Sequence, residues 1–161
     1  MPKKYELPAF LTDIVEPAQY QRWLYRKAQA HVKRDRKRGN KSATGETYRI
    51  AIHDAVSRCE GHDCYTGEQL NWKLLSTYDN EKSKADRRTY KRSLALLPTV
   101  DHVGDGIGRA DFGVCGWRTN GAKHDLDIPD FLSLCKTVLE HHGFTVTRTG
   151  RSKMRITRPA P

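Results

Sequence analysis

The chain has 161 residues, with 29 Lys and Arg against 19 Asp and Glu, which gives a formal net charge of +10. No apolar run approaches the roughly 18 residues that would cross a bilayer, so a membrane-spanning helix is excluded. The first ten residues also lack the apolar segment of a secretory signal, and we expect a cytoplasmic protein with no membrane association.

The basic residues are clustered along the chain. Residues 22–41 contain nine basic residues and one acidic residue, Asp35, and residues 82–92 contain six basic residues and one acidic residue, Asp86. Clustered positive charge indicates a nucleic-acid footprint, whereas a merely solubilising surface is the alternative. We therefore expect phosphate contacts, which do not read sequence, from Arg26, Lys33, Arg34, Arg36, Lys37, Arg38, Arg87 and Arg88.

Two helices are predicted near the N-terminus, over residues 17–38 and about 44–59. The first begins at Pro17, and its second half is nearly all charge. We therefore expect residues 1–42 to be a basic helical extension and residues 43–161 to form one α+β domain.

Between residues 95 and 126 the pattern predicts two short strands and a helix. The first strand ends near residue 103, and a loop rich in glycine follows it. The second strand covers residues 111–117 and a short helix covers residues 120–126. These elements make a ββα unit, which is the predicted core of the domain.

The C-terminal part predicts one more helix and a hairpin. The helix begins at Pro129 and runs to about His142, with its apolar residues on one face. Residues 144–157 alternate in polarity and are interrupted by Gly150, which predicts a terminal β-hairpin.

The central unit carries candidate ligands for a divalent cation. Asp101 ends the first strand and can offer a carboxylate oxygen, while Asn120 and His124 are spaced i, i+4 on the predicted helix. A hard cation prefers oxygen ligands, so we expect one ion, Mg²⁺ or another divalent ion such as Mn²⁺, held by these three side chains. The four cysteines contain no CxxC pair, so a structural zinc site is not expected.

His102 follows Asp101 directly and points to the other side of the strand. A neutral imidazole can take a proton from water as that water attacks phosphorus. The metal ion would stabilise the charge on the phosphorane and the departing oxygen. Arg118 and Lys123 are placed to hold phosphate oxygens, and Arg109 in the loop is a further nucleic-acid contact.

At this point the stretch resembles the HNH endonuclease family, the ββα-metal nucleases. Asp101-His102 match the family's first motif, and Asn120-Gly-Ala-Lys123 match its last. The middle Asn of the family falls on Asp111, which is a departure. In the family that residue ties the loop down so that the general base is aimed correctly. A carboxylate can accept such hydrogen bonds but cannot donate them.

The resemblance covers roughly residues 59 to 135, including a family-like segment at Cys64–Leu70. It implies an α+β protein with a ββα-metal core, in which His102 is the base, Asp111 replaces the loop-fixing Asn and Arg118 supports the phosphate. The implied activity is metal-dependent hydrolysis of phosphodiester bonds in DNA, most simply double-stranded. A double-strand cutter with one site per chain often pairs up, so a homodimer is possible.

Two alternatives remain open on the sequence alone. The first is a non-catalytic DNA- or RNA-binding protein that keeps a degenerate HNH scaffold, and the change at Asp111 supports it. The second is a basic interaction protein whose partner is an acidic protein.

Overall fold

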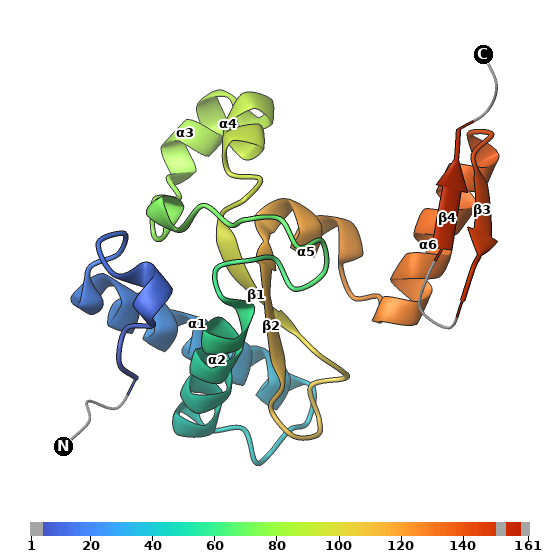
Figure 1. The fold of residues 1–161 in the computed structure, drawn as a ribbon. Coiled ribbons are helices and arrows are strands. Elements are labelled where there is room, and N and C mark those ends of the chain that lie inside the picture. The colour runs from blue at the N-terminus through green and yellow to red at the C-terminus, as the bar shows by residue number, and fades with distance from the viewer. Residues whose placement is uncertain (1–4, 151–153, 159–161) are drawn as a thin grey trace. The chain divides into compact units, whose positions relative to one another are not determined.

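The computed structural model describes residues 5–150 and 154–158. The chain divides into two compact units, residues 1–122 and residues 123–161, each of which folds around its own contacts. Figure 1 shows the elements of both units in chain order. None of the described helices is long and apolar enough to cross a membrane.

Helices open the first unit. A 3-10 turn, η1 (Ala9–Leu11), precedes α1 (Pro17–Lys37) and α2 (Gly45–Cys59). Proline is pre-organised for the first position of α1, and the Thr44 side chain caps α2 by accepting a hydrogen bond of 3.2 Å from the Thr47 amide. The two helices pack against each other, as Figure 1 shows. Both were expected from the sequence.

A β-hairpin and a helix complete the part of this unit that carries the site. β1 (Pro98–His102) pairs antiparallel with β2 (Phe112–Gly116), and His102 faces Phe112 across the pair. α5 (Trp117–Lys123) follows β2 directly, and α2 packs on β2. The expected α+β class is confirmed, and the expected order of strand, strand and helix is present.

α5 lies three residues earlier than the predicted helix at residues 120–126. It begins immediately after β2 because the Trp117 amide donates to the Leu97 carbonyl at 2.9 Å, which ties the first turn to the segment before β1. It ends at Lys123, and His124 takes a left-handed backbone conformation with φ of 54°. The predicted i, i+4 placement of His124 on the helical face of Asn120 was therefore wrong.

Three short helices lie between α2 and β1. They are η2 (Trp72–Leu74), α3 (Asn80–Ala85) and α4 (Arg87–Ser93). Asp79 and Asp86 cap α3 and α4 by accepting hydrogen bonds from backbone amides of the first turn. The basic cluster at residues 82–92 therefore lies on two short helices.

The core of the first unit includes α1, as the apolar stripe on the first half of this helix predicts, although residues 1–42 were expected to be an extension of the domain. Apolar residues spaced three or four apart on α1 pack with α2 and with both strands. The buried set includes Tyr20, Trp23, Leu24, Ala28 and Val32 of α1, Ile52 and Val56 of α2, Val100 of β1, and Phe112 and Val114 of β2. Residues 1–42 are not a separate extension, because removing α1 would open this core; the boundary between compact units instead follows Ala122.

The second unit holds the remaining helix and the terminal hairpin. α6 (Ile128–His141) is capped by Asp127, whose side chain accepts a hydrogen bond of 2.8 Å from the Asp130 amide. β3 (Thr145–Arg148) pairs antiparallel with β4 (Met154–Thr157). Both elements were expected; residues 151–153 of the hairpin lie outside the described residues.

His31 is buried on the core side of α1 and makes stability depend on pH. Burial, followed by the nearby Arg34 charge, lowers the pKa of His31 to about 3. An unfolded histidine takes up a proton below about pH 6.5. Between these values the unfolded chain holds one more proton than the folded chain, so the free energy of unfolding falls as the pH falls.

We expect His31 to lower the free energy of unfolding by about 1.4 kcal/mol for each pH unit below pH 6.5, or by about 2 kcal/mol at pH 5. Urea unfolding at several pH values measures the slope. His31→Gln, which cannot titrate, is the control and should have a flatter profile across this window. Equal slopes for the two proteins would show that His31 does not remain neutral in the folded state.

Candidate active site

β1 sends Asp101 and His102 to opposite faces of the hairpin, as successive residues of a strand must go. Both residues are almost buried, each with 8% exposure. The Asp101 face receives the segment after α2, and the His102 face receives α1 and α2. The two candidate residues therefore have different surroundings.

On the first face, a tyrosine engages Asp101. The Tyr65 hydroxyl donates a hydrogen bond of 2.6 Å to Oδ2 of Asp101. Burial, and then this hydrogen bond, raise the pKa of Tyr65 above its ordinary value, so the phenol remains a donor. Gly113 lies opposite Asp101 in β2, where a Cβ atom would come within 2.7 Å of the Cys64 sulfur. Glycine at this position lets the segment that carries Tyr65 approach the strand.

A buried carboxylate holds that segment to the start of α5. Asp63 is 2% exposed, and its Oδ1 accepts hydrogen bonds from the amides of Tyr65 and Thr66 at 2.8 and 3.2 Å. Its Oδ2 accepts one from the Gly116 amide at 2.8 Å. Because Gly116 is the last residue of β2, Asp63 fixes the position of Tyr65 relative to the hairpin.

On the second face, His102 meets a carboxylate from α1. Its Nε2 lies 3.1 Å from Oδ2 of Asp35, which is an ion-pair distance. The contact is not aligned as a hydrogen bond, and neither ring nitrogen has a hydrogen-bond partner among the described residues. The ring packs edge-on against Phe112, with centroids 5.0 Å apart. A buried imidazole with unsatisfied nitrogens calls for a water or ligand atom beside it.

Asp35 is fully buried and is stabilised by several neighbours. The Tyr48 hydroxyl donates a hydrogen bond of 2.7 Å to Oδ2, and burial followed by this bond raises the pKa of Tyr48 to about 12. The guanidinium nitrogens of Arg34 and Arg38 lie 3.4 and 3.9 Å from Oδ1. A buried negative charge must be compensated by nearby positive charge, and the guanidinium groups of these two arginines supply it to the Asp35 carboxylate.

The loop between the strands is anchored to the same corner. The Asn40 side chain donates a hydrogen bond of 2.9 Å to the Gly106 carbonyl. Gly106 has φ of 79°, and a Cβ atom there would lie 2.8 Å from Oδ1 of Asp35. Only glycine combines this backbone conformation with so close an approach. The Asn40 side chain therefore ties the loop to the connection between α1 and α2, whereas the Asp111 side chain pairs with Arg58.

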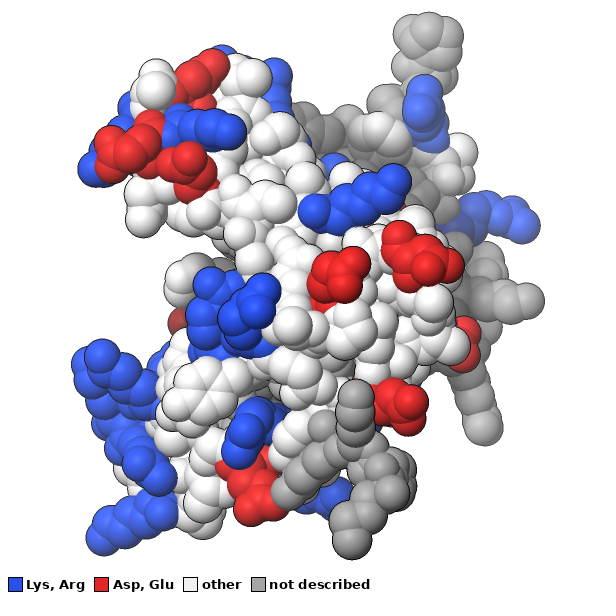
Figure 2. Space-filling model, turned by 90° about the vertical axis from the view of Figure 1, so that its left-hand side faces the viewer, with Lys and Arg blue, Asp and Glu red and all other residues white. Residues whose placement is uncertain are grey.

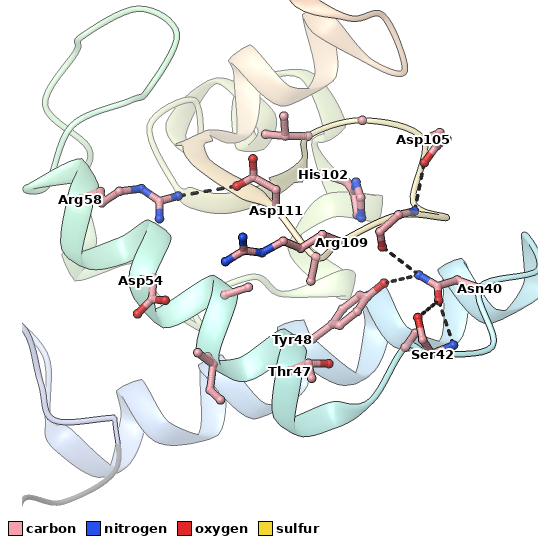
Figure 3. A pocket seen from close by; sticks show the side chains of 17 residues that line it. Asn40, Ser42, Thr47, Tyr48, Asp54, Arg58, His102, Asp105, Arg109 and Asp111 are labelled. Atoms are coloured by element: carbon pink, nitrogen blue, oxygen red, sulfur yellow. Dashed lines mark hydrogen bonds and ion pairs between the residues drawn. The ribbon is translucent and has the colours of Figure 1, made fainter.

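A groove opens beside His102. Figure 3 shows His102, Arg109 and Asp111 along one part of it and Tyr48 of α2 along another. Asp111 forms an ion pair with Arg58 of α2, with 3.7 Å between Oδ1 and the guanidinium nitrogen. The groove thus brings together three residues that the sequence singled out, His102, Arg109 and Asp111.

Other predicted residues lie elsewhere. Arg118 forms an ion pair with Glu68, with a shortest N···O distance of 2.6 Å, and it holds the pKa of that carboxyl below its usual range. Asn120 is half-buried within α5. Lys123 is 5% exposed, which does not suit a residue expected to reach phosphate, and His124 pairs with the neighbouring Asp125 at 2.7 Å.

The chemistry of Asp101 and Asn120 fits a hard divalent cation, since both offer oxygen. No group of three or more His, Cys, Asp or Glu side chains within residues 5–150 and 154–158 is arranged to hold a metal ion.

The basic residues of α1 fall into two groups. Spacings of four, seven and four residues place Arg22, Arg26, Lys33 and Lys37 on one exposed helical face, which we call the α1 stripe. Arg34 and Arg38 lie instead beside Asp35. Figure 2 shows separate groups of Lys and Arg on the face that it displays, and those at its lower left have no acidic side chains among them.

The remaining predicted contacts are exposed or partly engaged. Arg36 donates a hydrogen bond of 2.9 Å to the Ala43 carbonyl, and Arg87 and Arg88 form the exposed first turn of α4.

Neutralising two members of the α1 stripe should weaken nucleic-acid binding. Each phosphate contact contributes about 0.9 to the slope of log K against log salt concentration. The double variant Lys33→Gln, Lys37→Gln should therefore bind duplex DNA less tightly and reduce that slope by about 1.8. Fluorescence anisotropy at several salt concentrations measures both quantities.

A matched control is Lys73→Gln, Lys136→Gln, which removes the same charge from two exposed positions outside the stripe. Loss of affinity in both double variants to the same extent would show that net charge, and not the stripe, governs binding.

Sequence reasoning missed Asp35, Tyr48 and Asn40 as parts of the site. One signal was available, since Asp35 is the single acidic residue within the basic residues 22–41. Nothing in the sequence pairs it with a histidine 67 positions later.

The chain matched no protein-family model, no curated protein and no solved structure.

Proposed function

We propose that the protein is a metal-dependent endonuclease of the HNH type that hydrolyses phosphodiester bonds of double-stranded DNA. The observation that carries the proposal is His102 itself: a buried imidazole with no hydrogen-bond partner within residues 5–150 and 154–158, 3.1 Å from a carboxylate, on the wall of an open groove. It ends the first strand of a hairpin that leads directly into a helix, the order in which the family motifs occur.

His102 would act as the general base. Its imidazole takes a proton from the water that attacks phosphorus, a role that typically accelerates a reaction by about 10²- to 10⁴-fold. Arg109, on the same groove, would hold a phosphate oxygen through a charge-assisted hydrogen bond. The α1 stripe would contact phosphates further along the duplex without reading its sequence.

Asp101 and Asn120 would hold the divalent ion, Mg²⁺ or Mn²⁺. When bound, such an ion supplies Lewis-acid stabilisation of the charge that develops on the phosphoryl oxygens. Tyr65 would orient the Asp101 carboxylate through its hydrogen bond, as groups beside metal ligands commonly do. His124 has no part in this ligand set, because it lies beyond the end of α5.

A second candidate function is nucleic-acid binding without cleavage. Two contacts favour it. Asp101 is engaged by Tyr65 on the face opposite His102, and Arg118 is engaged by Glu68. In that case Asp101 and Arg118 would stabilise the fold instead of binding a metal ion and a phosphate.

One assay separates the two functions. Purified protein with Mg²⁺ or Mn²⁺ should convert supercoiled plasmid to nicked and linear forms, and EDTA should stop the conversion. Salt-dependent binding with no cleavage in any divalent metal would establish the second function in place of the first.

A further inference from the structure

We infer that Asp35 is a positioning residue: it keeps the proton of His102 on Nε2 and so leaves Nδ1 as the atom that accepts a proton from water. The inference deepens the proposed function and rests on it for its catalytic part. The tautomer itself is a property of the free protein and can be measured without cleavage.

The hydrogen-bonding capacity of the carboxylate assigns the tautomer. An ionised carboxylate only accepts hydrogen bonds. Oδ2 of Asp35 already accepts one from the Tyr48 hydroxyl at 2.7 Å, and the second group that faces it is Nε2 of His102 at 3.1 Å. An Nε2 lone pair aimed at that oxygen would be repelled, whereas an N–H would be attracted. Nε2 is therefore the protonated nitrogen.

Little free energy is needed to bring an Nε2–H of His102 into line with Oδ2 of Asp35. The terminal torsion of a histidine side chain is broad, so the ring can turn to bring its N–H into line at little cost. The carboxylate, by contrast, is held in place. Tyr48 binds Oδ2, and Gly106 lies so close to Oδ1 that a Cβ atom there would come within 2.8 Å of it. The fixed carboxylate of Asp35 thus orients the movable ring of His102.

The two rings that pack against His102 cannot select the tautomer in this way. Phe112 presents a ring edge without a polar atom. The His31 ring centroid lies 6.4 Å away, and its Nδ1 lies 2.7 Å from a guanidinium nitrogen of Arg34, so that nitrogen is an acceptor already in use. Among the described neighbours, Asp35 is the one whose oxygen faces Nε2 at close range.

Because Nε2 carries the proton, Nδ1 is the nitrogen of His102 that can accept a proton from water. It is buried and has no hydrogen-bond partner in the described part of the chain. His102 is also one of the residues that line the groove, so a small rotation of the ring would bring Nδ1 within reach of a water there. This arrangement resembles other base–carboxylate pairs, in which the wrong tautomer reduces turnover by about 10⁴-fold.

The experiment compares the wild-type protein with Asp35→Asn and Tyr48→Phe. Two-bond ¹H–¹⁵N correlation spectra of the histidine rings, recorded at alkaline pH, report which nitrogen of His102 carries the proton. We expect Nε2–H in the wild type, Nε2–H in Tyr48→Phe, which retains the carboxylate, and loss of that preference in Asp35→Asn. A wild-type spectrum showing Nδ1–H would overturn the inference without the need for any variant.

Steady-state cleavage provides the second readout. Asp35→Asn should lower kcat by about 100-fold or more while KM changes little, because the residue acts on the base and not on DNA. A general loss of structure would instead alter DNA affinity and the whole spectrum. Unchanged kcat in Asp35→Asn would also overturn the inference. If the wild type cleaves no DNA, the proposed function fails, and the spectra alone still decide the tautomer.

Discussion

Replacing His102 with alanine is expected to lower the rate of plasmid cleavage by about 100-fold or more, because it removes the imidazole that would accept a proton from the attacking water. Asp111, which lines the same groove, is engaged by Arg58. DNA affinity should stay close to that of the wild type, since the imidazole is almost buried and contributes no fixed positive charge to the surface. Initial rates at saturating Mg²⁺, with anisotropy for binding, measure the two effects separately.

The matched control for this substitution is His142→Ala, which removes an exposed histidine from the second unit. It should leave cleavage unchanged. His102→Gln should be examined beside His102→Ala, because a side chain with polar atoms fills the buried site better than a methyl group does. Continued cutting by both folded His102 variants would exclude this residue as the base.

Replacing Asp101 with asparagine is expected to lower cleavage by about 100-fold or more at every Mg²⁺ concentration, since a bound ion supplies several kcal/mol of charge stabilisation and each 1.4 kcal/mol corresponds to a factor of ten. The fold should persist. The Tyr65 hydroxyl, which donates to Oδ2 of Asp101, can donate equally well to an amide oxygen. Cleavage measured across a titration of Mg²⁺ and of Mn²⁺ gives the loss and any change in metal dependence.

Asp79→Asn is the appropriate control for the loss of one carboxylate. Asp79 caps α3 on the surface, and asparagine caps a helix about as well as aspartate does. This variant should therefore retain both stability and cleavage. Equal metal dependence in Asp101→Asn and the wild type would remove Asp101 from the ligand set.

The place of α1 in the core changes how the basic region should be tested. Deleting residues 1–42 would remove the core residues Trp23 and Leu24 together with Asp35, so any loss of activity would report a damaged fold. Point substitutions in the α1 stripe avoid this, because Lys33 and Lys37 are exposed. The basic cluster on α1 therefore contains residues with two different roles. The α1 stripe would contact phosphates, whereas Arg34 and Arg38 neutralise Asp35.

Local pattern was sufficient for most of the secondary structure. Pro17 and the apolar spacing of α1, the Thr44 cap of α2, the periodic face of α6 and the short apolar runs of β1 and β2 are all encoded within a few residues, and each predicted its element closely. The alternation of Asp101 and His102 across β1 also follows from strand geometry alone. Where a local signal was misread, as at α5, the helix start was set by a hydrogen bond to Leu97, twenty residues away.

The partners of the site residues could be decided only by the tertiary structure. Asp35 meets His102, Asp63 meets Gly116 and Glu68 meets Arg118 across 67, 53 and 50 positions of the chain. The groups that meet in each pair are complementary in charge or hydrogen bonding, but the same residue types occur at many other positions, so composition and spacing could not select these partners. Packing selected them, because burying α1 against the hairpin leaves the Asp35 carboxylate facing the His102 imidazole. The division of the chain after Ala122 is likewise a property of the tertiary contacts.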